Sequence, residues 1–386
     1  MPSPAAARGP AHRRIRTHGL LLALLALAAP APALQARAAG APSPSTAPSA
    51  PPGLPLARID ALVTEAMRVN SIPGLSLALV DRSGLFWSNG YGMADLENFV
   101  PARPFTVYRL ASVSKPITAV AVLQLVERGR IELDAPVRRY VPEMPEKPWP
   151  ITVRQLLCHQ GGVRNWTEDE FVSTRRYASL AESIALFRDD PLVNEPGTRV
   201  TYSSFGYTLL GRAVETASGQ SYPEYLRVSV LEPVGMEWTR LDDVQAIIPN
   251  RARGYRLTGG GSLLNSPLSD TSNRVPGGGL VGTAEDVGRF AAALMAGSLL
   301  KPETVRLMLT PQQTRDHRST GFGLGFVLGR HGQEREAYHT GGQSRVSTLL
   351  YLRPDRGFAV VLLTNLEGIG PALLELGRQI ADLAGH

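Results

Sequence analysis

Apolar residues follow two different spacings along the chain, and the order of these spacings predicts the layers of the fold. Helical spacing predicts a helix over Leu56–Asn70 and a second, strongly apolar helix over residues 112–128. Between them, strand-like runs at Gly74–Asp81 and Gly84–Tyr91 are joined by Asp-Arg-Ser-Gly, which is typical of a hairpin. The chain therefore enters its core through a helix and a β-hairpin.

The rest of the chain changes from helical to strand-like patterns. Short helical patterns broken by proline and glycine fill residues 130–275, and Thr283-Ala-Glu-Asp286 predicts a helix that starts with a capping box. The predicted elements of the C-terminal part are strands at 323–329, 347–353 and 358–364 and a last helix over 371–383. Strands early and late with helices between them predict an α/β (α+β) protein: an antiparallel, five-stranded-type sheet flanked by the N- and C-terminal helices, with an inserted helical subdomain.

The N-terminal segment is typical of a targeting sequence. Residues 1–37 hold basic residues from Arg8 to His18, an apolar run over Gly19–Ala29 and small residues after it. The apolar run is shorter than the roughly 20 residues that a membrane span needs, so we expect a cleaved signal peptide, export to the periplasm or the extracellular space, and no stable membrane anchor. A mitochondrial transit peptide, which is also rich in arginine, is the alternative.

We divide the remaining chain by composition. Residues 38–55 are rich in proline, alanine and serine and predict a linker. Residues 56–386 form the predicted domain, whose sheet part covers about 56–110 and 276–386 and whose helical part covers about 111–275.

Charge and cysteine content exclude several classes of function. The net charge is +6, but five of the 40 Lys and Arg residues lie in residues 1–37, which leaves 35 bases against 34 acids. No basic stripe for nucleic acid remains. The single cysteine, Cys158, allows no intramolecular disulfide, and the seven histidines form no His-Glu-x-x-His motif. We predict no metal and no cofactor, and the expected partner is a small-molecule, peptide or ester substrate.

Cys158 and its neighbour have structural roles in this prediction. They end an amphipathic helical run over residues 153–159, in which Cys158 packs in the core and His159 is a structural hydrogen-bonding residue. Consecutive positions of a helix point to different faces, which argues against a Cys-His pair. The sequence carries no signal for an oligomeric state.

Lysine usage gives the first sign of chemistry. Only three of the 40 basic residues are lysines, and an arginine cannot give up its proton in a protein, whereas a desolvated lysine can. One of the three is Lys115 in Ser112-Val-Ser-Lys115, at the start of an apolar helix. Residues three apart share a helix face, with Cβ atoms roughly 5–6 Å apart. The pattern fits a nucleophile with a base beside it; a helix N-cap serine followed by a solvated lysine is the alternative.

Two further motifs follow in an informative order. Tyr202-Ser-Ser204 precedes the apolar run 205–214, and His339-Thr-Gly341 leads into the strand predicted at 347–353. With Ser-x-x-Lys, these motifs resemble the penicillin-recognising serine hydrolases, which include class C β-lactamases, D-alanyl-D-alanine peptidases, related esterases and the LACTB-like branch. The resemblance extends from about Leu56 to the C-terminus and is strongest to the LACTB-like branch. It implies a β-lactamase/transpeptidase-like fold.

The resemblance also implies roles for individual residues. Ser112 would be the nucleophile that forms an acyl-enzyme, and Lys115 and Tyr202 would share its proton. The backbone N–H groups of Ser112 and Gly342 would form the oxyanion hole. Thr340 and the strand edge after it would hold the substrate backbone. Which of Lys115 and Tyr202 acts as the base is left open.

Two positions depart from the β-lactamase pattern. Ser204 stands where many relatives have asparagine, and His339 stands where most β-lactamases have lysine. A neutral imidazole attracts a substrate carboxylate less than an ammonium does, so these departures favour ester or peptide substrates over β-lactams. Arg345, four residues after Gly341, either restores a carboxylate contact or is a solvated charge at the strand edge.

The sequence therefore predicts an exported serine hydrolase that cleaves an ester or amide bond. A true class C β-lactamase or D-Ala-D-Ala carboxypeptidase is the alternative within the family. A non-catalytic penicillin-binding-like or assembly protein is the alternative from another class, and the presence of the complete Ser112, Lys115 and Tyr202 set argues against it.

Overall fold

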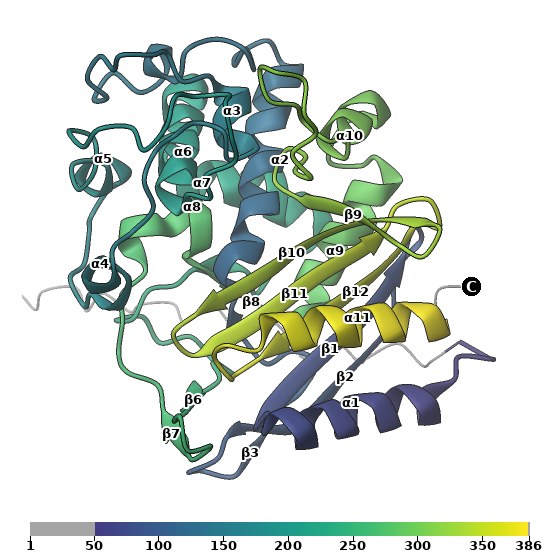
Figure 1. Ribbon diagram of the computed structural model, residues 1–386. Coiled ribbons are helices and arrows are strands. Elements are labelled where there is room, and N and C mark those ends of the chain that lie inside the picture. The colour runs from purple at the N-terminus through teal and green to yellow at the C-terminus, as the bar shows by residue number, and fades with distance from the viewer. Residues whose placement is uncertain (1–50, 385–386) are drawn as a thin grey trace, which may run out of the picture. The chain divides into compact units, whose positions relative to one another are not determined.

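An antiparallel sheet of seven strands forms the centre of the described chain, which comprises residues 51–384 of a computed structural model (Figure 1). The strand order is β3-β2-β1-β12-β11-β10-β9, so strands from the two ends of the sequence pair in the middle of the sheet. The strands are β1 (Gly74–Asp81), β2 (Gly84–Asp95), β3 (Val100–Pro101), β9 (Val327–His331), β10 (Glu334–Gln343), β11 (Val346–Arg353) and β12 (Phe358–Thr364). The predicted leader over residues 1–37, and most of the linker predicted over 38–55, lie outside the described residues.

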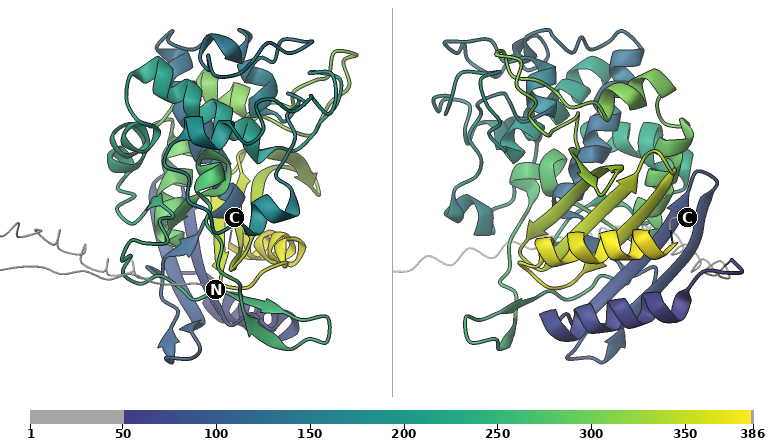
Figure 2. Two further views of the ribbon diagram at one scale, coloured as in Figure 1. Left: turned by 90° about the vertical axis from the view of Figure 1, so that its left-hand side faces the viewer. Right: turned by 45° about the vertical axis from the view of Figure 1, so that its right-hand side comes forward.

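The helices form two layers, one on each face of this sheet (Figures 1 and 2). The helices of one turn or more are α1 (Leu56–Asn70), α2 (Ser114–Glu127), α3 (Val153–Leu157), α4 (Glu168–Val172), α5 (Leu180–Ile184), α6 (Ser204–Ser218), α7 (Tyr222–Leu226), α8 (Val275–Gly278), α9 (Ala284–Ala296), α10 (Pro302–Met308) and α11 (Gly370–Ala384). Helices α1 and α11 cover one face, and α9 packs against β1 and β12 on the other face, with α2 and α6 beyond it. The predicted antiparallel sheet with flanking helices is confirmed.

Two small sheets lie outside the seven-stranded sheet. One consists of β4 (Tyr108–Arg109), β8 (Leu280–Gly282) and β5 (Arg240–Leu241), and the other is a ribbon of β6 (Tyr255–Leu257) and β7 (Leu263–Asn265). Because β4 lies directly before the Ser-x-x-Lys motif, the first of these sheets holds one end of the segment that carries the motif.

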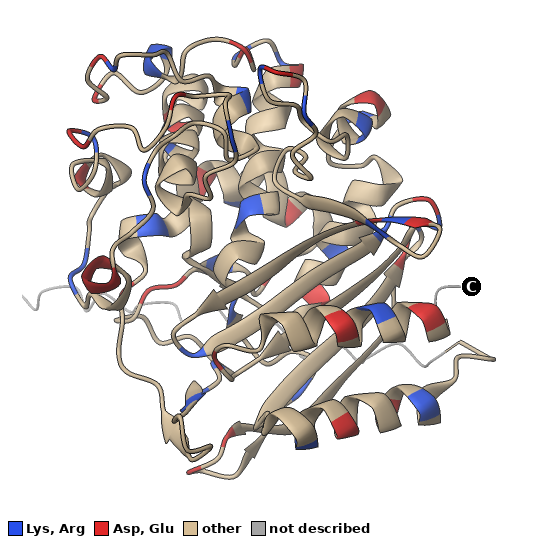
Figure 3. Cartoon of the chain, in the orientation of Figure 1, with Lys and Arg blue, Asp and Glu red and all other residues tan. Residues whose placement is uncertain are grey.

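The central strands are buried on both faces because helices cover both. In β1, Leu75, Leu77 and Leu79 belong to the hydrophobic cluster under α1 and α11, whereas Ala78 and Val80 belong to the cluster that contains α2, α6 and α9. Charged residues gather on the outer faces of α1 and α11 and in the loops, and the central strands carry few (Figure 3). A sheet covered on both faces needs such continuous apolar runs.

Some of the predicted boundaries match the structure and others need correction. Helix α1 and strands β1 and β12 begin and end where the residue patterns predict. Strands β1, β2, β9, β11 and β12 correspond to the five predicted strands, and β3 and β10 bring the observed sheet to seven. The strand expected from residue 323 begins at Val327, and β10 was not predicted, because its second half, with His339-Thr-Gly-Gly, has low strand propensity.

The predicted capping box at α9 is only half formed. The Thr283 side chain accepts a hydrogen bond from the backbone N–H of Asp286. The Asp286 carboxylate does not complete the box; it accepts from the Trp238 backbone N–H and from the Thr239 hydroxyl, both at 2.9 Å. This buried carboxylate therefore ties α9 to the segment before β5. Within residues 51–384, no helix is long and apolar enough to cross a lipid bilayer.

Candidate active site

Ser112 lies in a tight turn between the small sheet and the helical layer. The turn is a 3₁₀ helix over Ala111–Val113, and α2 begins at the next residue. Ala111 has a φ of 48°, a left-handed conformation that is costly for a residue with a side chain. The carbonyl of Leu110 accepts a hydrogen bond from the Thr348 hydroxyl of β11 at 2.8 Å. The sheet thus holds this strained turn in place at the N-terminus of α2.

The three motifs that are far apart in the sequence meet at the Ser112 hydroxyl. Lys115 Nζ lies 3.1 Å from Ser112 Oγ, and the Tyr202 hydroxyl donates a hydrogen bond to Ser112 Oγ at 2.7 Å. The Lys115 amine also lies 4.7 Å from the centre of the Tyr202 ring. The predicted juxtaposition of an amine, a hydroxyl and a phenol is therefore present in the structure.

Burial controls the charge of Lys115. Its side chain is fully buried, because α2 is apolar around its whole circumference and lies inside the helical layer. Besides Ser112, its amine donates to Ser204 Oγ at 3.1 Å and to the carbonyl of Gly277 at 2.5 Å. Burial, with a smaller contribution from the positive charge of Arg274, lowers the pKa of Lys115 well below its ordinary value of 10.5. The site thus contains a lysine that is readily neutral.

His159 fixes the segment that carries Tyr202. Its carbonyl accepts from the Thr201 N–H at 2.7 Å, its Nδ1 accepts from the Ser203 N–H at 3.2 Å, and its ring lies 4.3 Å from the Tyr202 ring between centroids. The predicted structural role of His159 agrees with these contacts. Its predicted place on a helix is wrong: α3 ends at Leu157, and His159 has a φ of 60°.

Burial acts on Tyr202 in the opposite direction from Lys115. It raises the pKa of the Tyr202 phenol above its ordinary value of 10, and the hydrogen bond to Ser112 offsets only part of this effect. At neutral pH the phenol therefore keeps its proton. Of the two candidates for the base, Lys115 is the one whose deprotonated form, which can accept a proton, is favoured in this structure.

The His339-Thr-Gly-Gly segment forms a free strand edge beside the turn. Strand β9 pairs with β10 only from Glu334 to Tyr338, so residues 339–343 have no strand partner on that side within the described chain. A Cβ atom on Gly341 would lie 3.0 Å from the Cβ of Ala111 and 2.7 Å from the Leu110 carbonyl, which places this edge against the Ser112 turn. An extended substrate segment could add to this edge through backbone hydrogen bonds.

His339 offers a hydrogen-bond acceptor rather than a charge. Its Nδ1 lies 2.7 Å from the Thr340 carbonyl, and a carbonyl can only accept, so Nδ1 carries the proton of the neutral ring. Burial and the nearby Lys115 charge lower the pKa of His339 to about 3. Its Nε2 is buried without a hydrogen-bond partner and therefore holds a free lone pair.

Thr340 and Arg345 were predicted to contact the substrate, and their positions in the structure differ from each other. No hydrogen bond joins the Thr340 hydroxyl to another described residue, and Thr340 pairs with Leu349 in β11. Arg345 has a φ of 82° in the turn after β10, and its backbone N–H donates to Glu367. Its side chain lines a small cavity with Arg109, and no contact joins it to Ser112 within residues 51–384. The structure therefore does not bring Arg345 into the group around Ser112.

Two residues of the site were not predicted from the sequence. The Asn165 side-chain oxygen accepts from the Ser204 N–H at 2.9 Å and so fixes the start of α6. Arg274 is 2 % exposed, donates to the carbonyls of Glu170 and Phe171, and adds positive potential near Lys115. No catalytic motif marks either residue. Among residues 51–384, no three His, Cys, Asp or Glu side chains gather where a metal ion could bind.

Close packing at Gly341 leads to a prediction about stability. A Cβ atom there would lie 2.1 Å from Thr348 Oγ1, whereas a Cβ on Gly342 would have no atom within 4 Å. We expect Gly341→Ala to lower the free energy of unfolding by about 1–3 kcal/mol, since the added methyl must push β10 away from the Ser112 turn. The matched Gly342→Ala variant should stay within about 0.5 kcal/mol of the parent. Urea denaturation of both variants measures the difference, and equal stabilities would contradict the packing argument.

Comparison with known proteins places this geometry in a family. Residues 59–385 match the sequence profile of the family described as Beta-lactamase. The chain belongs to the β-lactamase family. It is a serine hydrolase of that family, and the predicted likeness to the LACTB-like branch is confirmed by the serine β-lactamase-like protein LACTB, mitochondrial, of Homo sapiens. That relative is 28% identical over 406 residues, which cover 77% of this chain and 74% of the human protein. Protein flp of Staphylococcus aureus strain N315 is 27% identical and covers 84% of this chain and 66% of its own length.

Several solved structures have the same fold as this chain. The octameric penicillin-binding protein homologue from Pyrococcus abyssi superposes with a TM-score of 0.74 and 26% identity, covering 86% of this chain and 78% of that one. SurE superposes with a TM-score of 0.71 and 28% identity, and the match covers 85% of this chain and 75% of SurE. EstCE1, a hydrolase with promiscuous acyltransferase activity, has a TM-score of 0.72 at 23% identity, which shows the fold alone.

Proposed function

We propose that this β-lactamase-family protein hydrolyses an ester or amide bond through an acyl-enzyme on Ser112. The observation that carries the proposal is the position of Ser112 Oγ, 3.1 Å from the buried Lys115 amine and 2.7 Å from the Tyr202 hydroxyl. A serine hydroxyl is a weak nucleophile at its own pKa and needs such an adjacent base.

In the proposed first step, neutral Lys115 takes the Ser112 proton while Ser112 Oγ forms a bond to the substrate carbonyl carbon. The neutral amine keeps its two hydrogens on Ser204 Oγ and the Gly277 carbonyl, which leaves its lone pair for Ser112. The negative charge on the carbonyl oxygen is taken up by the backbone N–H groups of Ser112 and Gly342 in this proposal. Loss of one such donor typically costs about 2.7–4 kcal/mol of transition-state stabilisation.

The second part of the proposed reaction releases the two products. Tyr202, which keeps its proton, donates it to the leaving alcohol or amine and regains one from Lys115. A water molecule then attacks the acyl carbon and gives a proton to Lys115. As the bond between the acyl carbon and Ser112 Oγ breaks, Lys115 passes that proton to Oγ, which restores the serine hydroxyl and the neutral amine and releases the acid. This assignment gives Lys115 and Tyr202 separate tasks, which their opposite pKa shifts support.

The nature of the proposed substrate follows from His339. A free lone pair at the buried Nε2 accepts a hydrogen bond from a substrate N–H or O–H group but repels a carboxylate. The side-chain amide nitrogen of Gln343, four residues further along β10 and on the same face, is also buried without a partner and can donate to a substrate carbonyl. We therefore propose a neutral ester or amide with an N–H group near the scissile bond as the preferred substrate. The D-amino acid amidase from Ochrobactrum anthropi SV3, which shares the fold at 23% identity, acts on amides by its name.

A labelled fluorophosphonate tests the nucleophile directly. We expect the label on the peptide that contains Ser112, and none on the Ser112→Ala variant. Ser114→Ala is the matched control, since Ser114 lies two residues away and its hydroxyl accepts from Leu280 instead. Labelling that persists in Ser112→Ala would refute the proposal, whereas labelling without turnover of any ester would favour the non-catalytic alternative.

The charge at position 339 should decide between esters and β-lactams. We expect His339→Lys to raise the rate of nitrocefin acylation relative to hydrolysis of p-nitrophenyl butyrate by roughly tenfold or more, because an ammonium there binds the β-lactam carboxylate. Stopped-flow absorbance with both substrates measures the ratio. A ratio that does not change would show that position 339 does not limit the β-lactam reaction.

We also propose that residues 1–37 direct export and are cleaved. The mammalian LACTB relatives are named mitochondrial, which makes mitochondrial import the alternative. N-terminal sequencing of the chain recovered from its own cells, together with fractionation, separates the two: a new terminus near residue 38 in the extracytoplasmic fraction is expected for export.

A further inference from the structure

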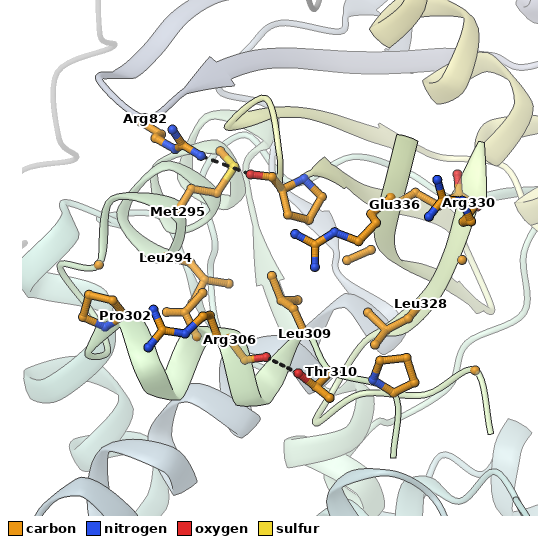
Figure 4. Close-up of a pocket in the computed structure, with 18 of the residues that line it drawn as sticks. Arg82, Leu294, Met295, Pro302, Arg306, Leu309, Thr310, Leu328, Arg330 and Glu336 are labelled. Atoms are coloured by element: carbon orange, nitrogen blue, oxygen red, sulfur yellow. Dashed lines mark hydrogen bonds between the residues drawn. The ribbon is translucent and has the colours of Figure 1, made fainter. Parts of the chain in front are cut away.

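A large cavity in the described part of the chain lies away from Ser112. It has a volume of about 800 Å³ and is formed by the end of α9, α10, β9, the start of β10 and the loop after α10 (Figure 4). None of Ser112, Lys115, Tyr202 and His339 lines it. The volume is typical of a small-molecule site, and the proposed hydrolysis does not use it.

The interior of the cavity is aliphatic. Leu294 and Ala337 are buried in its wall, and Val305, Leu309 and Leu328 are half-buried side chains that pack on the main hydrophobic core. Figure 4 shows Leu294, Leu309 and Leu328 between the labelled arginines. Half-buried aliphatic side chains around an open volume gain free energy when an apolar group covers them.

The margin of the cavity carries arginines that form no ion pair with a described residue. Arg82, Arg306 and Arg330 line the cavity, and none of the three forms an ion pair with a described residue. The Arg82 guanidinium donates to the Pro354 carbonyl at 3.2 Å, which keeps its positive charge available.

The acids near the cavity are already engaged. Glu336, the acid of the lining, is buried and bound by Arg378 at 2.6 Å, and Asp355 pairs with Arg335. The guanidiniums of Arg82, Arg306 and Arg330 therefore remain to attract an anion, and a guanidinium is the group best shaped to bind a carboxylate.

We propose that this cavity binds a single-chain amphiphilic carboxylate, a fatty acid, with its alkyl chain on the leucines and its carboxylate at the arginines. An aliphatic interior with a cationic margin matches a ligand that is apolar along its length and anionic at one end. A neutral apolar ligand would leave the arginines unused, and a small polar anion would leave the leucines uncovered.

The test uses decanoate, titrated into the purified chain by isothermal titration calorimetry. We expect binding that tightens by roughly fourfold for each added methylene between octanoate and dodecanoate. Decanol, which has the same chain without the charge, should bind at least tenfold more weakly. Absence of decanoate binding, or equal binding of decanol, would overturn the proposal.

Variants locate the ligand. The triple variant Arg82→Gln, Arg306→Gln, Arg330→Gln should weaken decanoate binding at least tenfold, since all three side chains are exposed and their loss should leave the fold intact. Arg256→Gln, an exposed arginine in β6 without an ion pair in the described residues, is the matched control and should bind as the parent does. Unchanged binding by the triple variant would overturn the assignment to this cavity.

A second arm separates this site from the proposed catalytic one. Protein labelled at Ser112 by a fluorophosphonate should bind decanoate with the parent affinity, because Ser112 does not line the cavity. Loss of binding after labelling would place the fatty acid in the catalytic cleft and overturn the proposal. Failure of labelling itself would count against the proposed hydrolysis and would leave the calorimetric result on the cavity intact.

Discussion

Lys115→Met is expected to reduce hydrolysis of p-nitrophenyl butyrate by about 10³-fold or more. Methionine matches the length of the lysine side chain and suits a fully buried position, so the variant removes the amine while it keeps most of the packing. Positioned general bases typically contribute 10²–10⁴-fold, and here the same amine is proposed to act in both halves of the reaction. Initial rates under saturating and limiting ester give kcat and kcat/KM.

A control and a pH profile make this prediction specific. Lys301→Met removes another of the three lysines, an exposed one, and should leave the rates unchanged. In the parent, kcat/KM should fall as the pH drops through the lowered pKa of Lys115, since protonation removes the lone pair. His339, with its pKa of about 3, should not contribute a limb near neutrality. Normal turnover by Lys115→Met would end the assignment of Lys115 as the base.

The same substitution has a consequence for stability that depends on pH. In the unfolded chain Lys115 binds a proton up to about pH 10.5, whereas burial keeps the amine neutral in the folded state well below that pH. Between the two pKa values the unfolded state binds more protons, so the free energy of unfolding rises with pH. Lys115→Met lacks this dependence, and its stability relative to the parent should improve as the pH falls from 10 through this window.

The catalytic motif could be found in the sequence because it contains a lysine, a residue type that this chain otherwise hardly uses. Lysine is rare here, and Lys115 stands three residues after Ser112 at the head of an apolar run, so two local observations coincide. The residues that contact this motif from distant parts of the sequence could not be found in the same way. Arg274 is one arginine among many, and its charge lies near Lys115 because α8, which directly follows Arg274, packs against α2. Its role depends on tertiary contacts that no local pattern encodes.

The strands also differ in how well local sequence predicts them. Uniform apolar runs identify β1 and β12, because a strand covered on both faces must be apolar at nearly every position. Strand β10 ends in polar residues and glycines that serve the site rather than the sheet, so its sequence does not indicate a strand. The same local view treats Arg345 as part of a strand edge. In the tight turn after β10, its side chain instead lines the small cavity that Arg109 also lines.

Breaking the buried ion pair between Arg109 and Asp242 is expected to cause a large loss of stability. Arg109 Nε lies 2.7 Å from an Asp242 carboxylate oxygen, and the two side chains are 4% and 2% exposed. Removing one partner of a buried pair leaves a desolvated charge. We therefore expect Arg109→Met to lower the free energy of unfolding by about 3–5 kcal/mol. The loss should lie near the lower figure, because Arg251, 3.7 Å from the same carboxylate, still balances part of its charge.

The surface offers a matched control for this pair. Arg139 and Glu132 are also 2.7 Å apart, but their side chains are 60% and 63% exposed. Water screens such a pair, so Arg139→Met should cost less than about 1 kcal/mol. Urea denaturation of the two methionine variants compares equal distances at different burial, and similar losses would show that burial of the Arg109 pair is not what matters.

A double variant separates the lost attraction from the charge that is left behind. Arg109→Met combined with Asp242→Leu removes both charges, and we expect it to recover a large part of the stability lost in Arg109→Met alone. Activity should not recover with it. Arg109 also donates to the carbonyl of Ser344 at 3.3 Å and to Ser269, so it joins β4, directly before Ser112, to the turn after β10. A stable double variant with low kcat would show that the pair is retained to hold the Ser112 turn against the substrate-binding edge, rather than to stabilise the fold.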